Sequence, residues 1–191
     1  SSLVPVVSQM LAMVLESARI PAGVFSMVQG PRDPLGAHLL RHPGTDLVVG
    51  AGSAAFGDAA RAAVGNARPV SVQTGGKGWA IVCSDADLDR AAYEVVSGAF
   101  LTAGQRCNAT SRVLVERAIA RPFLTRVVAL MRGLRIGPAV DRDVFCGPLA
   151  SGEQRKAFQT HLQEWGRAGI EFPVDGGSGQ LPPSLRKKGQ C

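Results

Sequence analysis

Apolar positions in the first part of the chain follow helical and strand periods in turn. Between residues 6 and 15 they recur every three to four residues, which predicts a helix that ends before Pro21. In chain order we then expect a strand at 24–28, a short helix at 35–40, a strand at 46–49, a helix at 54–64 and a strand at 70–73. Strands that alternate with helices over short connections are typical of a parallel sheet with crossover helices.

A glycine-rich stretch at residues 74–78 interrupts this pattern, and a second series of elements follows it. We expect strands at 79–83, 112–115 and 170–173, and helices at 88–103, 119–132 and 153–167. The segment Ser84-Asp85-Ala86-Asp87 offers N-cap chemistry for the first of these helices, and Gly104 is expected to end it, so that residues 105–108 form a turn. The prediction is an α/β chain with a first unit at 1–73, a second unit at 74–185 and a basic tail at 186–191.

The composition fits a folded chain outside the membrane. Of the 191 residues, 46% are hydrophobic, which is enough apolar surface to offset the entropy lost on folding. The longest apolar runs are far shorter than the ~20 residues that span a bilayer, and no signal-peptide pattern opens the chain. We expect a cytoplasmic protein without a membrane partner. Because the chain opens on Ser1 and not on Met, we also expect it to be a fragment of something larger.

The charge balance argues against nucleic-acid binding. The net charge of +6 comes mostly from arginines scattered singly along the chain, and only 5% of the residues are aromatic. Nucleic-acid surfaces usually carry clustered basic stripes with aromatic side chains for stacking. The four cysteines, Cys83, Cys107, Cys146 and Cys191, show neither CxxC spacing nor a nearby histidine, so we expect no metal site and no disulfide framework.

Two segments could carry chemistry. Glycines at 50, 52 and 57 follow a predicted strand and open a helix, where free N–H groups attract phosphate; packing explains such glycines equally well. Cys107 lies in the predicted turn between Arg106 and Asn108, where positive charge favours the nucleophilic thiolate. By spacing alone, Cys107 is more often an ordinary half-buried cysteine.

Several ordered motifs together resemble the aldehyde dehydrogenase family. Residues 70–77, Val-Ser-Val-Gln-Thr-Gly-Gly-Lys, resemble its Glu-Leu-Gly-Gly-Lys segment, and residues 97–107 resemble the segment that carries its nucleophile. Residues 47–57 resemble its Phe-Thr-Gly-Ser turn and the following helix, and residues 146–151 resemble its Gly-Pro-Leu-Ile-Ser turn. The resemblance runs from residue 1 to about residue 185. The wording Thr-Ala-Gly-Gln-Arg-Cys is most similar to the succinylglutamate semialdehyde dehydrogenase branch, which places the reaction in arginine catabolism.

The resemblance implies a fold and a site. It implies a partial Rossmann-like cofactor domain followed by a partial α/β catalytic domain, truncated at both ends, and a homo-oligomer for the full-length form. Cys107 would attack a small-molecule aldehyde and NAD or NADP would accept the hydride, which leaves a thioester for hydrolysis. The residues implied to bind the cofactor are Gly52, Ser53, Ala54, Ala55, Phe56, Gly57, Thr74 and Gly75.

The sequence departs from the family at its general base. Gln73 stands 34 positions before Cys107, where the family has a glutamate, and Thr74 replaces an apolar residue. An amide cannot take a proton near neutral pH, so hydrolysis of the thioester should be slow. Two alternatives to aldehyde oxidation with hydrolysis therefore stay open: transfer of the acyl group to coenzyme A, and an inactive or truncated homologue. At the start of the chain, Ser2 stands where the family's ribose motif has a carboxylate, which would favour tolerance of NADP.

Overall fold

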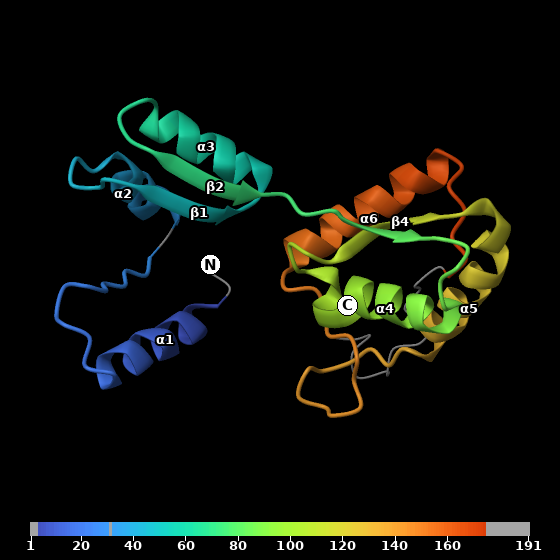
Figure 1. Cartoon of the computed structure of the whole chain (residues 1–191). Coiled ribbons are helices and arrows are strands. Elements are labelled where there is room, and N and C mark those ends of the chain that lie inside the picture. The colour runs from blue at the N-terminus through green and yellow to red at the C-terminus, as the bar shows by residue number, and fades with distance from the viewer. Residues whose placement is uncertain (1–3, 31, 175–191) are drawn as a thin grey trace. The chain divides into compact units, whose positions relative to one another are not determined.

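A computed structural model describes residues 4–30 and 32–174 of the chain, and the predictions for Ser1, Ser2, Cys191 and the basic tail concern residues outside these ranges. The chain divides into two compact units, the first ending at Gly75 and the second beginning at Gly76. Figure 1 shows the elements of both units. Within residues 4–30 and 32–174, no helix is both long enough and apolar enough to cross a membrane.

The first unit is built around a β-α-β element. Strand β1 (Val48–Gly52) leads into helix α3 (Ala54–Val64) and then into strand β2 (Val70–Thr74). The two strands are parallel, with Val48 opposite Val70 and Gly52 opposite Thr74. Helix α1 (Pro5–Ser17), a π-helical turn η1 (Arg32–Gly36) and helix α2 (Ala37–Arg41) precede them. The parallel order expected from the sequence is confirmed.

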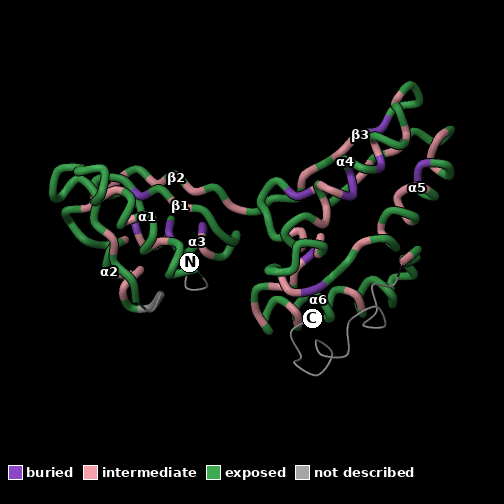
Figure 2. Tube along the Cα trace, turned by 90° about the horizontal axis from the view of Figure 1, so that it is seen from below, coloured by how far each residue is buried: buried purple, intermediate pink, exposed green. Residues whose placement is uncertain are grey.

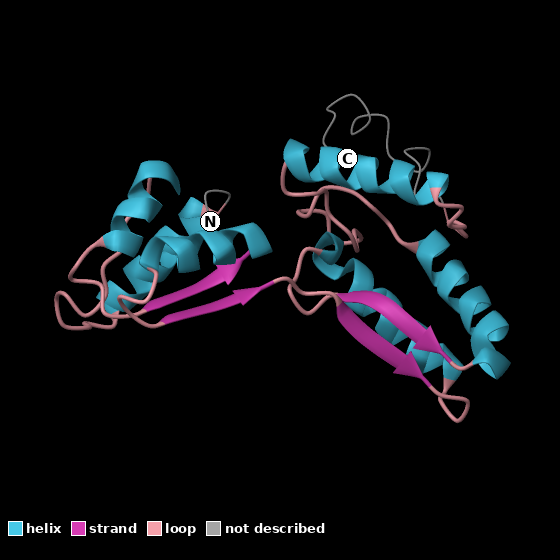
Figure 3. Ribbon diagram, turned by 90° about the horizontal axis from the view of Figure 1, so that it is seen from above, coloured by secondary structure: helices cyan, strands magenta, loops and turns pink. Residues whose placement is uncertain are grey.

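Helix α3 lies on the two strands through one face. Its buried residues Gly57, Ala60 and Val64 recur at helical spacing, which is the pattern of an amphipathic helix on a sheet. Figure 3 shows helices and the two strands of this unit side by side. Helix α3 ends at Val64, and the C-cap Gly65 has a φ of 57°, a left-handed conformation that glycine adopts without a steric penalty. This small apolar face fixes where the start of α3 lies relative to the ends of β1 and β2.

The prediction of a strand at 24–28 is wrong. Residues 24–28 pair with neither β1 nor β2, so their backbone N–H and C=O groups take no part in that strand ladder. Helix α1 forms as its periodicity predicts, but none of its residues is buried. Apolar character alone therefore does not make a strand here, because a strand needs a neighbouring strand to satisfy its backbone groups.

The second unit contains a second β-α-β element. Strands β3 (Gly78–Val82) and β4 (Thr110–Val115) are parallel, with an irregularity between Gly78 and Trp79. Helix α4 (Leu88–Phe100) and the 3₁₀ turn η2 (Leu101–Gly104) connect them. A second 3₁₀ turn η3 (Arg117–Ile119), helix α5 (Ala120–Gly133) and helix α6 (Gly152–Arg167) complete the described part of the unit.

The core of the second unit lies between the two strands and helices α4 and α5. Val82, Ala92, Val95 and Phe123 form its buried centre, and Figure 2 marks such buried segments in purple. On the opposite side of the strands, Trp79 is exposed, with the guanidinium of Arg112 4.9 Å from its ring centroid. The core therefore fixes the position of α4, and η2 connects the C-terminal end of this helix to the turn that contains Cys107.

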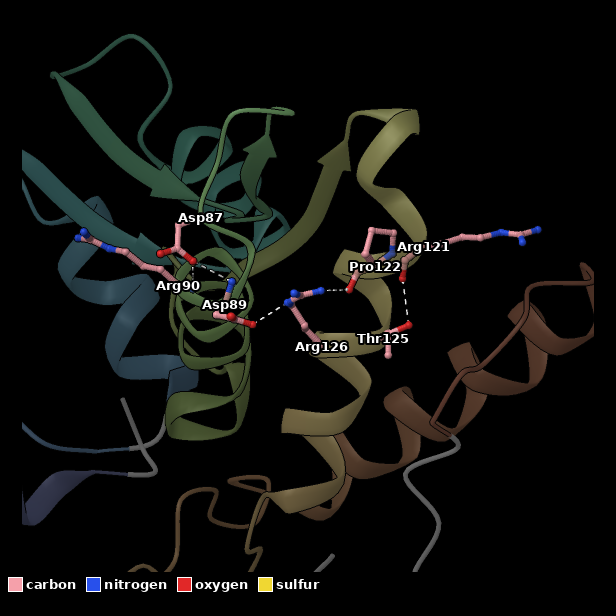
Figure 4. A network of polar contacts seen from close by, with 7 residues as sticks. All are labelled: Asp87, Asp89, Arg90, Arg121, Pro122, Thr125 and Arg126. Atoms are coloured by element: carbon pink, nitrogen blue, oxygen red, sulfur yellow. Dashed lines mark hydrogen bonds and ion pairs between the residues drawn. The ribbon is translucent and has the colours of Figure 1, made fainter.

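Polar contacts on the surface add to the α4–α5 packing. The Asp87 carboxylate accepts hydrogen bonds from the backbone N–H groups of Asp89 and Arg90, which caps α4 as expected. Arg126 on α5 reaches across to Asp89 with 2.6 Å between Nε and Oδ1, and also donates to the carbonyl of Pro122 (Figure 4). These contacts fix the N-terminal end of α4.

Two further expectations for the second unit are wrong. The helix expected at 88–103 ends at Phe100, because Thr102 and Ala103 turn to left-handed backbone angles. The expected strand at 170–173 does not form, and these residues follow α6 without regular structure. The remaining helices and strands lie within a few residues of their expected ranges.

Candidate active site

Cys107 lies at the corner of a tight turn between η2 and β4. The backbone N–H of Ala109 donates to the carbonyl of Arg106 at 3.1 Å, which closes the turn and leaves Cys107 and Asn108 as its two corner residues. The Cys107 thiol is free and its residue is exposed, whereas Ala109 is buried. The interpretation of Cys107 as a half-buried structural cysteine is therefore wrong. Cys107 is therefore an exposed residue on a turn whose backbone is fixed by the bond between Ala109 and Arg106.

The glycine-rich segment that opens the second unit packs directly against this turn. A Cβ built on Gly76 would lie 2.9 Å from the carbonyl oxygen of Cys107, and one on Gly78 would lie 2.8 Å from that of Ala109. Real Cβ atoms do not approach backbone oxygens so closely, so both positions need glycine. Gly76 also has a φ of 132°, a conformation open to glycine. The Gly-Gly-Lys-Gly sequence thus supports the backbone of the cysteine turn.

The chain approaches Cys107 through a strained reversal. Thr102, Ala103 and Gly104 have consecutive positive φ angles of 59°, 55° and 65°. Left-handed angles at non-glycine residues cost roughly 1–3 kcal/mol each and persist where surrounding structure enforces them. Gly104 is required on a second ground, since a Cβ there would lie 2.8 Å from the carbonyl oxygen of Ala99. The strain lies within five residues of the candidate nucleophile.

The side chain of Gln105 joins this reversal to a distant turn. Its Oε1 accepts a hydrogen bond of 2.8 Å from the backbone N–H of Ala150, and its Nε2 donates to the carbonyls of Thr102 and Pro148, each at 3.4 Å. Beside it lies an open pocket of about 900 Å³. The pocket is lined by Leu101, Thr102, Gln105, Ala139, Val144, Phe145, Gly147, Pro148, Leu149, Ala150, Ser151, Gly152 and Arg155.

The second candidate segment lies in the first unit, at the start of α3. Ser53 is the N-cap, and its hydroxyl accepts from the N–H of Phe56 at 3.2 Å. Residues 52–55 are exposed, so the N–H groups of the first turn face solvent. The Phe56 ring folds back over β1, where a Cβ on Gly50 or Gly52 would lie 2.9 or 3.0 Å from ring carbons. Packing therefore accounts for these two glycines, while Ala54 and Ala55 leave the helix start open.

The remaining candidates of the first unit lie along β2. Gln73 is exposed on this strand, and Thr74 and Gly75 follow it at the end of the unit. Gly57 is buried against Thr74, since a Cβ on Gly57 would lie 2.5 Å from the Thr74 Cγ2 methyl. The structure thus groups Thr74 with the start of α3. Gln73 belongs to the first unit and Cys107 to the second.

Among the described residues, the other cysteines and the histidines do not add a metal site. Cys83 is exposed after β3 and Cys146 is buried in the turn before Gly147. His161 lies 3.2 Å from the Glu164 carboxylate on the surface of α6. In the part of the chain that the structure describes, no three of the histidine, cysteine, aspartate and glutamate side chains are grouped so that they could hold a metal ion.

Sequence reasoning missed the supports of the cysteine turn. Gln105 stands two residues before Cys107, but its partner Ala150 lies 45 residues further along the chain, and no local pattern relates the two. Gly76 and Gly78 do have a visible signal, because closely spaced glycines suggest close backbone approach. That signal does not say which backbone approaches.

The comparison with known families gives one match along almost the entire sequence. The sequence pattern of the aldehyde dehydrogenase family matches residues 1–189. Betaine aldehyde dehydrogenase 2 of Rhizobium meliloti is 38% identical over 163 residues, which are 85% of this chain and 34% of the relative. The 2-hydroxymuconic semialdehyde dehydrogenase of Pseudomonas putida is 35% identical over 183 residues, 95% of this chain and 38% of the relative.

The fold also matches a solved structure over most of this chain. The NAD-dependent aldehyde dehydrogenase from Sinorhizobium meliloti superposes with a TM-score of 0.86 at 31% identity, over 90% of this chain and 34% of that chain. The chain therefore spans about a third of the length of the curated relatives it matches.

Proposed function

The chain belongs to the aldehyde dehydrogenase family, and on that premise we propose that it carries the nucleophile of an NAD- or NADP-dependent aldehyde oxidation. The observation that carries the proposal is the exposed Cys107 thiol, held at the corner of a turn whose backbone is braced by Gly76 and Gly78. A thiol on a rigid and exposed backbone can meet a carbonyl carbon with little loss of entropy at the moment of reaction.

The proposed chemistry at Cys107 is an acylation in two steps. The thiolate sulfur forms a bond to the aldehyde carbon, and the carbonyl π electrons move to oxygen, which gives a thiohemiacetal. The backbone N–H of Cys107 is a candidate donor to that oxygen. Loss of the C–H hydrogen with its electron pair then leaves a thioester on Cys107. NAD or NADP, when bound, supplies the hydride acceptor.

The start of α3 suits the phosphates of such a cofactor. Exposed N–H groups at a helix N-terminus attract anions, and the small side chains of Ser53, Ala54 and Ala55 leave room for a close approach. Gly52, whose missing side chain makes space for the Phe56 ring, leads the chain into this turn. Phe56 and Gly57 belong to this first turn of α3. Thr74 borders the turn through its contact with Gly57, and Gly75 directly follows Thr74 in the chain. We propose these residues as the cofactor site. The Sinorhizobium relative is named NAD-dependent, which supports NAD as the acceptor.

The fate of the thioester depends on Gln73. A carboxylate in its place would take a proton from the attacking water, a function that the amide cannot perform near neutral pH. The exposed Gln73 amide therefore favours a second candidate function, in which a thiol such as coenzyme A takes the acyl group in place of water. A homologue that acylates but does not turn over is the remaining alternative.

The substrate class is proposed only as an aldehyde. The relatives carry the names of betaine aldehyde and 2-hydroxymuconic semialdehyde dehydrogenases, so their names span charged and semialdehyde substrates. Assignment to the succinylglutamate semialdehyde branch, and with it to arginine catabolism, stays a prediction. We also propose a cytoplasmic enzyme that forms a homo-oligomer in its full-length form.

The test is a single-turnover measurement of NADH or NADPH absorbance at 340 nm with betaine aldehyde or a dicarboxylic semialdehyde. We expect a burst of at most one equivalent per chain, followed by slow turnover. Cys107→Ser should abolish the burst, and the matched variant Cys83→Ser, which changes another exposed cysteine, should keep it. A burst that survives in Cys107→Ser, or no burst in the parent chain, would contradict the proposal for this polypeptide.

A further inference from the structure

We propose that Gln105 is a positioning residue for Cys107, because its side-chain amide ties the strained approach to the cysteine turn to the loop at residues 147–150. This inference rests on the proposed function, since it assigns Gln105 a part in presenting the thiol to a carbonyl carbon. The Gln105 side chain contacts neither the thiol sulfur nor the carbonyl carbon that this sulfur would attack. It acts through the backbone that carries Cys107.

The two ends of the cysteine turn are held in different ways. Downstream, Thr110 opens β4 and is paired in the parallel ladder with Gly78. Upstream, the chain passes through residues 102–104, whose left-handed backbone angles are unfavourable at Thr102 and Ala103. A ladder holds itself through its own hydrogen bonds, whereas a strained reversal persists only where its surroundings enforce it. The upstream end therefore needs an external support.

Gln105 supplies that support with both halves of its amide. Its backbone N–H donates to the Thr102 carbonyl at 3.1 Å, and its Nε2 donates to the same carbonyl at 3.4 Å, so this oxygen accepts two hydrogen bonds from Gln105. Its Oε1 accepts from the Ala150 N–H at 2.8 Å, and Nε2 also reaches the Pro148 carbonyl. The shortest of these bonds crosses 45 residues of sequence.

The far side of this connection is itself anchored. Ala150 directly precedes Ser151, the N-cap of α6, whose hydroxyl accepts from the N–H of Gln154 at 3.2 Å. The loop that Gln105 grips is thus continuous with the start of a helix of 16 residues. Through Gln105, the upstream end of the cysteine turn is fixed against that helix start. The glutamine amide can act in both directions at once, because it carries a donor and an acceptor on one planar group without a charge.

The test compares two reactions of Cys107 on the same 191-residue chain. Acylation by p-nitrophenyl acetate requires an oriented attack on a carbonyl carbon, and it needs neither a nicotinamide cofactor nor an aldehyde. Alkylation by iodoacetamide requires only an exposed thiolate. Peptide mass spectrometry follows each reaction at Cys107, with the exposed Cys83 as an internal reference.

Gln105→Met keeps the length of the side chain and removes both polar groups. We expect its acylation rate at Cys107 to fall about ten-fold, because a small misplacement of a nucleophile is costly, while alkylation stays within about two-fold. Gln105→Glu keeps an acceptor for Ala150 and loses the donor, so it should fall between the parent and Gln105→Met. The matched control Gln163→Met, at an exposed glutamine of α6, should leave both rates unchanged.

The outcomes separate positioning from folding and from the proposed function. A variant that unfolds would gain alkylation at the buried Cys146 and would change both reactions together. An unchanged ratio of acylation to alkylation in Gln105→Met would overturn the inference, as would a parent Cys107 that the ester acylates no faster than Cys83. A failed aldehyde burst with an altered ratio would reject the proposed function and leave the positioning role standing.

Discussion

Gly76 and Cys107 are in backbone contact: a Cβ added to Gly76 would lie 2.9 Å from the Cys107 carbonyl oxygen and 3.5 Å from its Cα. The glycine sits at the start of the second unit, 31 positions before the cysteine. Two motifs that are separate in the sequence therefore meet at one point of the fold. The absence of a side chain at Gly76 is what allows this approach.

Replacing Gly76 by alanine should displace the cysteine turn. Both the contact with the Cys107 oxygen and the φ of 132° oppose a side chain there, so we expect Gly76→Ala to lower the free energy of unfolding by about 1–3 kcal/mol. Urea denaturation followed by tryptophan fluorescence measures this change, since Trp79 lies in the neighbouring strand β3.

A second glycine provides the matched control for Gly76. Gly133 is the last residue of α5, and a Cβ built there meets no atom within 4 Å. Gly133→Ala should be neutral or stabilising by up to about 1 kcal/mol, because alanine favours the helix. Equal effects of the two substitutions would mean that the contact between Gly76 and Cys107 does not limit stability.

The comparison of sequence and structure shows which inferences are local. The helix at 54–64 could be predicted to the residue, because its alanine-rich composition lies within the segment itself. The strand expected at 24–28 is absent, since strand formation depends on a partner that local spacing cannot reveal. The early end of α4 at Phe100 was not visible either, because left-handed angles at Thr102 and Ala103 contradict their local preference.

The candidate site follows the same division. The turn at Cys107 could be predicted from residues next to it in the sequence, whereas the bond from Ala150 to Gln105 could not. Gly52 shows the difference clearly. In the sequence this glycine suggests a phosphate-binding turn, whereas in the structure it makes space for the ring of Phe56. Tertiary contacts, which periodicity does not encode, account for each of these differences.

Gly57 and Thr74 should behave as a coupled pair. A Cβ on Gly57 would lie 2.5 Å from the Thr74 Cγ2 methyl, so Gly57→Ala should destabilise the first unit by about 1–3 kcal/mol through overpacking. Thr74→Ser removes that methyl and should restore most of the loss in the double variant. Thermal unfolding of the four proteins gives the coupling energy. Additive effects would show that the crowding lies elsewhere.

Two neighbouring residues of α5 should differ in their contribution to stability. Phe123 is 4% exposed and fills the core, so Phe123→Ala should cost about 3–5 kcal/mol. Arg126 pairs with Asp89, but the two side chains are 39% and 83% exposed, so Arg126→Ala should cost no more than about 1 kcal/mol. Urea unfolding of both variants in low and high salt tests this order. A larger loss in Arg126→Ala would mean that the network of Figure 4 holds α4 more strongly than the core does.

Gln73→Glu should change the fate of the acyl group without changing its formation. Gln73 is exposed on β2, so a carboxylate there remains solvated and can accept a proton from water. On the proposed function, in which residue 73 is the general base for hydrolysis, we expect the variant to speed hydrolysis of the acetyl group that p-nitrophenyl acetate leaves on Cys107 by about 10²–10⁴-fold, the usual range of general-base assistance. Release of p-nitrophenolate after the first equivalent reports this step, and the size of the first burst should stay the same.

A charge placed two residues away separates catalysis from electrostatics in this experiment. Ser71 is also exposed on β2, so Ser71→Glu adds the same charge to the same strand. That variant should keep the slow hydrolysis of the parent chain. Equal acceleration by both glutamates would assign the effect to charge in general, and no acceleration in Gln73→Glu would show that Gln73 is not what limits turnover. Acceleration by Gln73→Glu alone would place the proton-accepting position of the proposed reaction at residue 73.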